Sequence, residues 1–316
     1  MCGMKMRSLA GREVSPLGLG CMGMSWLYTP SGRDDHASIE VINAAIDNGI
    51  NLFDTADVYG PYTNEELIGR AIVGRRDEVV ITSKCGAVEI EPGKVVRNGT
   101  PEHVRKSCDD ALSRLGLDVI DAYLLHRLDP DVPLLETWGA FAELQQAGKV
   151  RSIGLSEVSV EQLNECNAQQ HVDIVQSELS LWTQDHLDTV VPWCETHDSV
   201  FMAYSPLGRG FLTGAYQNTT FEDGDFRSTN PRFTTQAAEQ NQKIVDAVHG
   251  IAQRKDATAG QIALAWVLTT GPHVLAIPGT RRLSHLMENI GALDVELDAT
   301  DLAELQALPA PVGERY

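Results

Sequence analysis

The hydrophobic positions of this chain fall into short continuous runs, separated by longer segments in which apolar residues recur every three or four positions. Several of the short runs carry no polar interruption, which is typical of strands buried on both faces of a parallel sheet. We expect eight such strands, at Leu17–Cys21, Asn51–Asp54, Val79–Lys84, Ala122–His126, Ser152–Ser156, Ile174–Ser177, Phe201–Tyr204 and Val274–Pro278.

The segments between these runs combine helical periodicity with signals for helix ends. Pro101 stands at a first helical position after Thr100, Ser159 is a candidate N-cap, and Gly49 and Gly148 are candidate stops. The expected helices are His36–Asn48, Thr63–Ala71, Pro101–Leu115, Leu134–Ala147, Ser159–Cys166, Gln184–His197, Gln236–Lys255, Thr258–Thr270, Leu283–Ala292 and Ala299–Leu308.

This alternation predicts right-handed βαβ units and a parallel sheet. Eight repeats favour an α/β fold of the closed (β/α)8 kind, a TIM barrel formed by residues 1–316 as a single domain. We expect an extra C-terminal helix and long loops at the C-terminal face. The rival is an open doubly wound sheet, because residues 18–23 match G-x-G-x-x-G as a string. No clear βαβ unit with the acidic residue of a dinucleotide fingerprint follows that string, so the barrel is our prediction.

Composition narrows the classes of function. Lys and Arg number 25 and Asp and Glu 44, a formal net charge of −19, which disfavours nucleic acid or an anionic membrane as partner. No run approaches the roughly 20 apolar residues that span a bilayer, and the first residues do not resemble a secretory signal. We therefore expect a cytoplasmic protein, with no metal site and with free thiols at Cys2, Cys21, Cys85, Cys108, Cys166 and Cys194.

Candidate chemistry gathers at the ends of three consecutive strands. Asp54 ends the second strand, Lys84 the third and His126 the fourth, and Tyr59 lies just beyond Asp54. Taken singly, each residue has a purely structural explanation. Asp54 can cap a turn, and Tyr59 can be an ordinary loop aromatic. Lys84 can be a surface charge, and His126 a hydrogen-bonded structural histidine. Together they converge at one side of a barrel mouth, where the active sites of such barrels lie.

Lys84 indicates which chemistry this group of residues could carry out. Lys84 ends a buried apolar run and needs a counter-ion, which Asp54 on the adjacent strand supplies. A lysine beside a phenol stabilises the ionised phenol, so we expect the pKa of Tyr59 to be lowered toward working pH. A phenol of this kind is suited to general acid or base catalysis.

The chain resembles the aldo-keto reductases through the residues of this group. The strings Phe53–Gly60, Ile81–Lys84 and Leu124–His126 match the family's motifs in order. The resemblance runs from about residue 7 to residue 307 and is closest to a bacterial and plant branch. Further matches are Gly154–Ser156, Val175–Glu178, Ala203–Gly208 and Ile277–Arg281.

The resemblance implies reduction of an aldehyde or ketone with NADPH, reversible as alcohol oxidation. It makes Tyr59 the proton donor, Lys84 with Asp54 the pair that tunes it, and His126 the residue that orients the carbonyl. The rival is a cofactor-bound regulatory subunit similar to the potassium-channel β-subunits, which keep the same four residues. A third class, a metal-dependent hydrolase, lacks enough ligands, and Lys84 would repel a metal ion.

The resemblance also implies a cofactor site. It assigns the carboxamide to Ser156 and Gln176, the stacking face to Tyr204, the ribose region to Gly23 and Met24, and the pyrophosphate to Ser205, Leu207, Gly208 and Gly210. It assigns the adenosine end to Gly279, Arg281, His285, Glu288 and Asn289. We expect Arg281 to bind the 2′-phosphate and thus favour NADPH over NADH, although Arg281–Arg282 can also be a solvated basic pair.

Two features stay open in the sequence. Glu157 stands where many family members carry Asn, and it either favours the oxidised cofactor or pairs with a neighbouring base. Substrate selectivity is expected in the loops 127–133, 209–233 and 309–316. Within them Arg227 either lies over the pyrophosphate or pairs with Asp223 or Asp225. Candidate pocket walls are Met24, Trp26, Tyr28, Tyr316 and Trp182, the last of which fits a core position equally well.

Overall fold

The protein is seen here in a computed structural model that describes residues 4–9, 11–91, 93–215 and 220–315. Eight parallel strands form one sheet in the order β3-β4-β5-β8-β9-β10-β11-β12. All eight expected strands are confirmed, with ends that differ from expectation by no more than two residues. They are β3 (Leu19–Gly20), β4 (Leu52–Asp54), β5 (Val80–Cys85), β8 (Ile120–Leu125), β9 (Val150–Ser156), β10 (Ile174–Glu178), β11 (Val200–Tyr204) and β12 (Val274–Ile277).

The two edges of this sheet meet, so the sheet is a closed barrel and not an open one. Leu17 forms a parallel bridge with Ala276, and Gly20 forms one with Gly279. Glycine is needed at this seam, because a Cβ on Gly20 would lie 2.9 Å from the carbonyl oxygen of Ile277. The (β/α)8 expectation is therefore confirmed.

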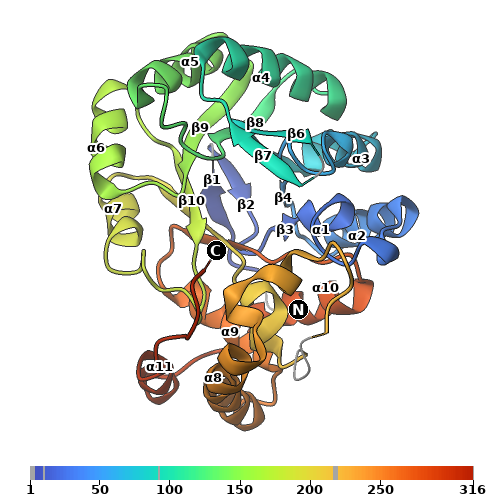
Figure 1. Ribbon diagram of the computed structural model, residues 1–316, viewed down its shortest axis with the longest axis vertical. Coiled ribbons are helices and arrows are strands. Elements are labelled where there is room, and N and C mark those ends of the chain that lie inside the picture. The colour runs from blue at the N-terminus through green and yellow to red at the C-terminus, as the bar shows by residue number, and fades with distance from the viewer. Residues whose placement is uncertain (1–3, 10, 92, 216–219, 316) are drawn as a thin grey trace.

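Helices surround the strands as a ring (Figure 1). The hydroxyl of Thr100 accepts the N–H of His103 and caps the start of α4, and Gly116, with φ of 65°, caps its end. The expected 184–197 helix is wrong at its start, because residues 185–189 form turns before α7 begins. The helices are α1 (Met22–Ser25), α2 (Asp35–Asp47), α3 (Thr63–Ala71), α4 (Pro101–Leu115), α5 (Leu134–Gln146), α6 (Val160–Gln169), α7 (Val190–Thr196), α8 (Thr235–Arg254), α9 (Ala259–Thr269), α10 (Leu283–Ile290) and α11 (Ala299–Gln306).

Short 3-10 helices occupy several connections. Three of them, η3, η4 and η5, give order to the long loop before α8, which the sequence left without elements. In the described part of the chain they are η1 (Pro30–Gly32), η2 (Arg76–Glu78), η3 (Gly208–Thr213), η4 (Phe226–Thr229), η5 (Pro231–Phe233) and η6 (Gly291–Asp294).

Two β-hairpins were not expected from the sequence. The first, β1 (Arg7–Leu9) with β2 (Arg12–Val14), packs Leu9 and Val14 against the inward residues of the barrel strands and closes its N-terminal end. The second, β6 (Ala87–Glu91) with β7 (Lys94–Arg97), directly follows β5. Its first residue, Ala87, packs with Tyr59, so this hairpin borders the site.

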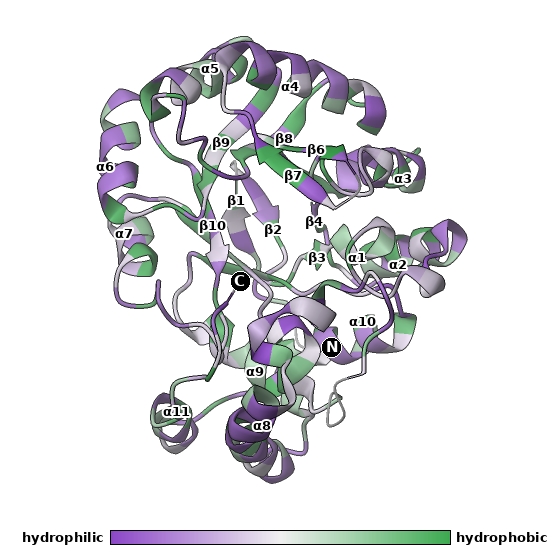
Figure 2. Cartoon of the chain, in the orientation of Figure 1, coloured by the Kyte–Doolittle hydropathy of each residue, from purple (hydrophilic) through white to green (hydrophobic). Residues whose placement is uncertain are grey.

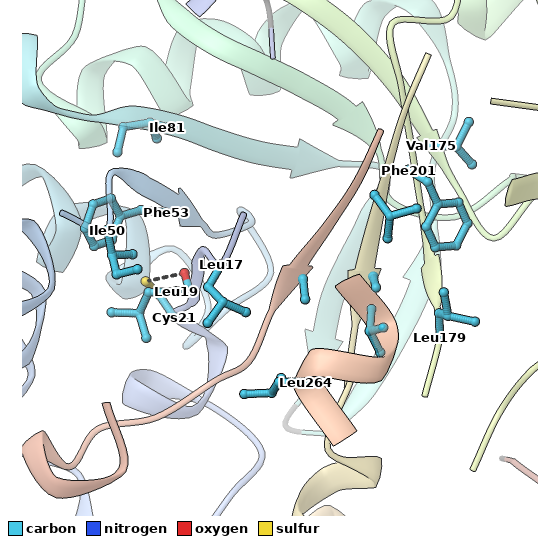
Figure 3. Packing of buried hydrophobic residues seen from close by; sticks show 14 of the residues in the cluster. Leu17, Leu19, Cys21, Ile50, Phe53, Ile81, Val175, Leu179, Phe201 and Leu264 are labelled. Atoms are coloured by element: carbon cyan, nitrogen blue, oxygen red, sulfur yellow. Dashed lines mark hydrogen bonds between the residues drawn. The ribbon is translucent and has the colours of Figure 1, made fainter. Parts of the chain in front are cut away.

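The main core lies between the strands and the ring of helices. Phe53, Ile81 and Phe201 belong to it, and Figure 3 shows them with other residues of this layer. The helices of the ring carry both hydrophobic and hydrophilic residues, as Figure 2 shows, which fits one buried and one solvated face. Within the described residues, none of the helices has the length and apolarity that crossing a membrane would take.

Candidate active site

Lys84 is the centre of the site. Its side chain is 0% exposed, and its Nζ donates to Asp54 Oδ2 at 2.7 Å and to the carbonyl oxygen of Thr55 at 2.7 Å. The same nitrogen lies 3.4 Å from the Tyr59 hydroxyl. Burial lowers the pKa of Lys84, but Asp54 and Tyr59 raise it by more, so the amine stays charged. The predicted convergence of these three residues is present in the structure.

Asp54 is held by neighbours on both sides. Its Oδ1 accepts the hydroxyl of Thr82 at 2.8 Å and the side-chain amide of Gln176 at 2.8 Å. A buried carboxylate with this many donors is fixed in place and paired, which removes most of the cost of burying it. Gln176, which the resemblance assigns to the cofactor carboxamide, is thus placed on Asp54 by the structure.

The expected direction of the Tyr59 pKa is wrong. Lys84 does lower that pKa, but burial raises it by more and Asp54 adds to the rise, so the pKa lies above its ordinary value. The sequence indicated that Lys84 lies beside the Tyr59 phenol. It did not indicate how completely Tyr59, which is 6% exposed, is removed from solvent. Tyr59 is therefore a protonated phenol at neutral pH, the form that can donate a proton.

His126 follows the end of β8 and faces Tyr59. The two rings have centroids 5.7 Å apart and meet edge to face. Burial, with Lys84 and Arg127 adding to it, lowers the pKa of His126 well below its ordinary value, so the imidazole is neutral. Within the described part of the chain, its Nδ1 is a buried nitrogen without a hydrogen-bond partner. A buried polar atom of this kind is suited to a ligand that completes it.

Arg127 is a site residue that the sequence indicated only as the first residue of the loop 127–133. Its Nη1 donates to the carbonyl oxygen of His126 at 2.6 Å and to the hydroxyl of Ser156 at 3.0 Å. Its guanidinium carbon lies 6.0 Å from the centre of the Tyr204 ring. Its position directly after the strand-end histidine was the only signal. Arg127 thus connects His126 with two residues expected to hold the nicotinamide.

The five candidate pocket walls differ in their surroundings. Trp26 is beside the reacting group, with its ring centroid 5.8 Å from that of Tyr59. Tyr28 lies against Arg227, whose guanidinium carbon is 5.0 Å from the ring centre. Trp182 is 2% exposed and stacks on Phe211 at 4.4 Å, so its assignment as a pocket wall is corrected to a core position. Met24 is buried in the main core. Tyr316 lies outside the described residues.

The turn after β11 has the backbone that a close-packed anion site needs. Ser205 has φ of 49°, and Gly208, Arg209 and Gly210 have φ of 57°, 58° and 92°. Left-handed residues in sequence can build a concave backbone surface for phosphate oxygens. Leu207 accepts the N–H of Gly210 and holds the turn closed. A Cβ on Gly208 would lie 2.7 Å from Trp182, so the glycine there is needed for packing.

The expected adenosine residues follow β12, the strand that pairs with β11. Gly279 is at the seam, and Arg281 donates to the carbonyl oxygens of Gly23, Tyr28 and Thr29 at 3.4, 3.5 and 3.0 Å. Burial, together with the nearby Arg33 and Arg282, lowers the pKa of Arg281. Crowded cations favour an anion between them. Three more expected residues are on α10, where His285 is exposed, Asn289 is buried and Glu288 accepts the hydroxyl of Thr258 at 2.7 Å.

The two open alternatives have structural answers. Glu157 accepts the N–H of Glu178 at 2.9 Å, contacts the Arg315 guanidinium, and lies 3.9 Å from His186. Burial raises the pKa of Glu157, but His186 and Arg315 outweigh it and bring the pKa to about 2. Arg227 pairs with Asp225 at 2.6 Å. Both residues are thus in ion pairs, and the structure favours pairing over a direct role of Glu157 at the nicotinamide.

Comparison with known proteins identifies the family of this chain. Residues 16–310 match the model of the aldo/keto reductase family. A probable aldo-keto reductase 1 from Glycine max is 40% identical over 310 residues, which cover 97% of this chain and 89% of that protein. The chain belongs to the aldo/keto reductase family and is an oxidoreductase.

Two solved structures are similar over nearly their whole length. A glycerol dehydrogenase from Gluconobacter oxydans has a TM-score of 0.87 at 29% identity, with 100% of this chain and 99% of that chain covered. An aldo/keto reductase from Klebsiella pneumoniae in complex with NADP and acetate has a TM-score of 0.75 at 29% identity, with 99% of each chain covered. Both likenesses support the closed barrel described above.

Proposed function

We propose that this protein reduces aldehydes or ketones with NADPH and catalyses the reverse oxidation of alcohols. The observation that carries the proposal is the buried Lys84 ammonium, which contacts Asp54 at 2.7 Å and the Tyr59 hydroxyl at 3.4 Å. A structural ion pair needs only the first contact. The second aims a fixed positive charge at a phenol, and His126 faces the same phenol.

The residues at the mouth fit a dinucleotide cofactor with an additional phosphate. The left-handed turn at 208–210 suits a pyrophosphate, and the cations near Arg281 suit a 2′-phosphate. Binding of NADP by the Klebsiella relative supports the same cofactor here. Tyr204, beside Arg127 at the end of β11, would give the nicotinamide ring a flat face, and Ser156 and Gln176 would hold its amide. When bound, the cofactor supplies the hydride.

The chain's own groups handle the proton and the developing charge. Tyr59 is a protonated phenol and donates its proton to the carbonyl oxygen. The Lys84 ammonium stabilises the phenolate left behind. The neutral imidazole of His126 keeps one N–H, which donates a hydrogen bond to the same oxygen and orients it. Two donors placed before charge develops lower the barrier more than donors that must reorganise.

The test is NADPH oxidation over a panel of aldehydes and ketones, with a Tyr59→Phe protein alongside. Turnover in the parent that is lost in the variant supports the proposal and begins to define the pocket. NADPH binding without turnover on any carbonyl, and without NADP⁺ reduction by alcohols, would instead favour the regulatory-subunit alternative. The cytoplasmic location and the lack of a nucleic-acid partner stay predictions of the sequence.

The pH dependence should follow the two shifted groups. Reduction needs the protonated phenol, and the pKa of Tyr59 is raised, so kcat/KM for reduction should stay flat from about pH 6 to about pH 9 and fall only above about pH 10. Oxidation needs the phenolate and should rise with pH over the same range. The pKa of His126 is lowered, so no inflexion near its ordinary value is expected. A reduction profile that falls between pH 6 and 9, roughly the range between the ordinary histidine and tyrosine values, would contradict this assignment.

Arg281 should determine the preference between the two nicotinamide cofactors. Arg281→Ala removes a charged donor to a phosphate, an interaction worth about 1.5–3 kcal/mol, so the Kd for NADPH should rise roughly ten- to a hundred-fold. The Kd for NADH, which lacks that phosphate, is the internal control and should change little. Equal losses for both cofactors would show that Arg281 acts only by holding the carbonyls of residues 23–29.

A further inference from the structure

A buried carboxylate and a partly buried one at the mouth pair with arginines from the long loop before α8 and from the C-terminal segment. Glu178, 2% exposed at the end of β10, lies 3.3 Å from Arg209, 3.6 Å from Arg315 and 4.0 Å from Arg232. Glu157, at the end of β9, contacts Arg315 as well. Arg209 lies in η3 at the start of the long loop, Arg232 in η5 near its end, and Arg315 in the C-terminal segment. We call Glu157 and Glu178 with these arginines the ionic hub.

The C-terminal segment, residues 309–315, is tied to the hub by backbone and side chain. The carbonyl oxygen of Arg315 accepts Arg209 Nη1 at 3.1 Å and Asn230 Nδ2 at 2.9 Å. Val312 exchanges two hydrogen bonds with the Asn241 side chain, at 2.8 and 3.0 Å. Arg232 donates to the carbonyl oxygen of Gly313 at 3.2 Å. Figure 1 shows the C-terminus within the ring of helices.

Arg209 is part of both the 208–210 turn and the ionic hub. Its backbone lies between Gly208 and Gly210 in the turn expected to hold the pyrophosphate, with φ of 58°. A non-glycine residue in that region is strained and persists only when its surroundings hold it. Its side chain, 5% exposed, is held by Glu178 and by the carbonyl oxygen of Arg315. The C-terminal segment therefore supplies one of the contacts that hold this residue of the turn.

We propose that Arg315 is a positioning residue for the cofactor. By docking the C-terminal segment on Glu157 and Glu178, Arg315 holds Arg209, and through it the 208–210 turn, in the conformation that retains the pyrophosphate. This inference rests on the proposed function and adds to it a determinant of cofactor release. It also assigns Glu157 a role, as the anchor of the segment and not as a ligand of the nicotinamide.

The experiment measures how fast NADPH leaves the protein. Arg315→Met replaces the apolar methylene stem of the arginine with an unbranched apolar side chain but removes the contacts with both carboxylates. The dissociation rate constant, followed by stopped flow after mixing the NADPH complex with excess NADP⁺, should rise roughly ten- to a hundred-fold, as expected for loss of charged hydrogen bonds. Arg315→Lys can pair with one carboxylate at a time. Its dissociation rate constant for NADPH should therefore lie between those of the parent protein and Arg315→Met.

Two further variants separate this role from a general loss of stability. Arg254→Met removes an exposed arginine that pairs with Asp301 and Glu304 on α11, away from the hub, and should release NADPH at the parent rate. Glu157→Gln should also accelerate release, but by less than Arg315→Met, because the pairing of Arg315 with Glu178 remains. The double variant of Glu157 and Arg315 should be no faster than Arg315→Met alone, because Arg315→Met has already removed the contact with Glu157. Thermal unfolding of each protein shows whether release changes more than stability does.

The outcomes distinguish this inference from the proposed function. If the parent protein binds NADPH and reduces carbonyls but Arg315→Met releases NADPH at the parent rate, the inference is wrong and the function stands. The same holds if Arg315→Met raises only the KM for the carbonyl, since the segment then contacts substrate alone. If the parent protein does not bind NADPH, the proposed function itself fails.

Discussion

Tyr59→Phe should lower kcat for carbonyl reduction by about 10²–10⁴-fold, the usual contribution of a positioned general acid. The substitution removes one oxygen from a ring that is 6% exposed and packs with Ala56, Val58 and Ala87, so the fold should be retained. The lost oxygen is the one that Lys84 contacts at 3.4 Å. Single-turnover and steady-state rates with one aldehyde measure the effect, and the Kd for NADPH should stay within about two-fold if only proton donation is lost.

Tyr62→Phe is the matched control for that variant. Tyr62 lies three residues further along the same loop, is 44% exposed and faces Arg114 with its ring. Removing its hydroxyl should change kcat by less than about two-fold, as surface substitutions usually do little. Comparable losses in both variants would mean that the loop is sensitive to any change and would remove the support for Tyr59 as the acid.

Lys84→Met should have the second large effect, on stability and activity together. The substitution leaves the Asp54 carboxylate, 4% exposed, without its cation. Breaking a buried ion pair on one side costs about 3–5 kcal/mol of unfolding free energy. Activity should also fall, because the phenolate formed at Tyr59 loses its stabilising charge. Denaturant unfolding and kcat measured on the same preparation report the two losses.

A double variant separates these two losses. Lys84→Met with Asp54→Asn removes both charges and keeps a side-chain oxygen to which Thr82 and Gln176 can donate. No buried charge is then left unpaired. Stability should therefore recover by most of the loss of the single variant, whereas kcat should not recover. Recovery of both would show that Lys84 matters only as the partner of Asp54.

The fold was accessible from the sequence because its signals are local. The strand at 200–204 is specified by continuous apolar residues, and the helix at 101–115 by Pro101 at its first position. The hairpin of β1 and β2 was missed because its strands are three residues each and alternate with charged side chains. What fixes it is the packing of Leu9 and Val14 inside the barrel, a contact between distant residues.

The site could be predicted from the sequence only in part, because some of its properties depend on contacts between distant residues. Strand ends placed Asp54, Lys84 and His126 correctly, because register follows from the apolar runs. The pKa direction of Tyr59 was wrong, since burial depends on the whole packed structure. The pairing of Glu157 with Arg315 joins residues 158 positions apart and leaves no local pattern in the sequence.

The barrel seam has a consequence for how the chain folds during synthesis. The bridges of Leu17 with Ala276 and Gly20 with Gly279 join positions near the two ends of the chain. A growing chain therefore carries an open sheet edge until the last strand leaves the ribosome, and contacts of such separation form slowly. Unpaired edges invite aggregation. Arg281 follows the seam directly, so the site for the cofactor phosphate is completed only in that final step, and free cofactor would add its binding energy to closure.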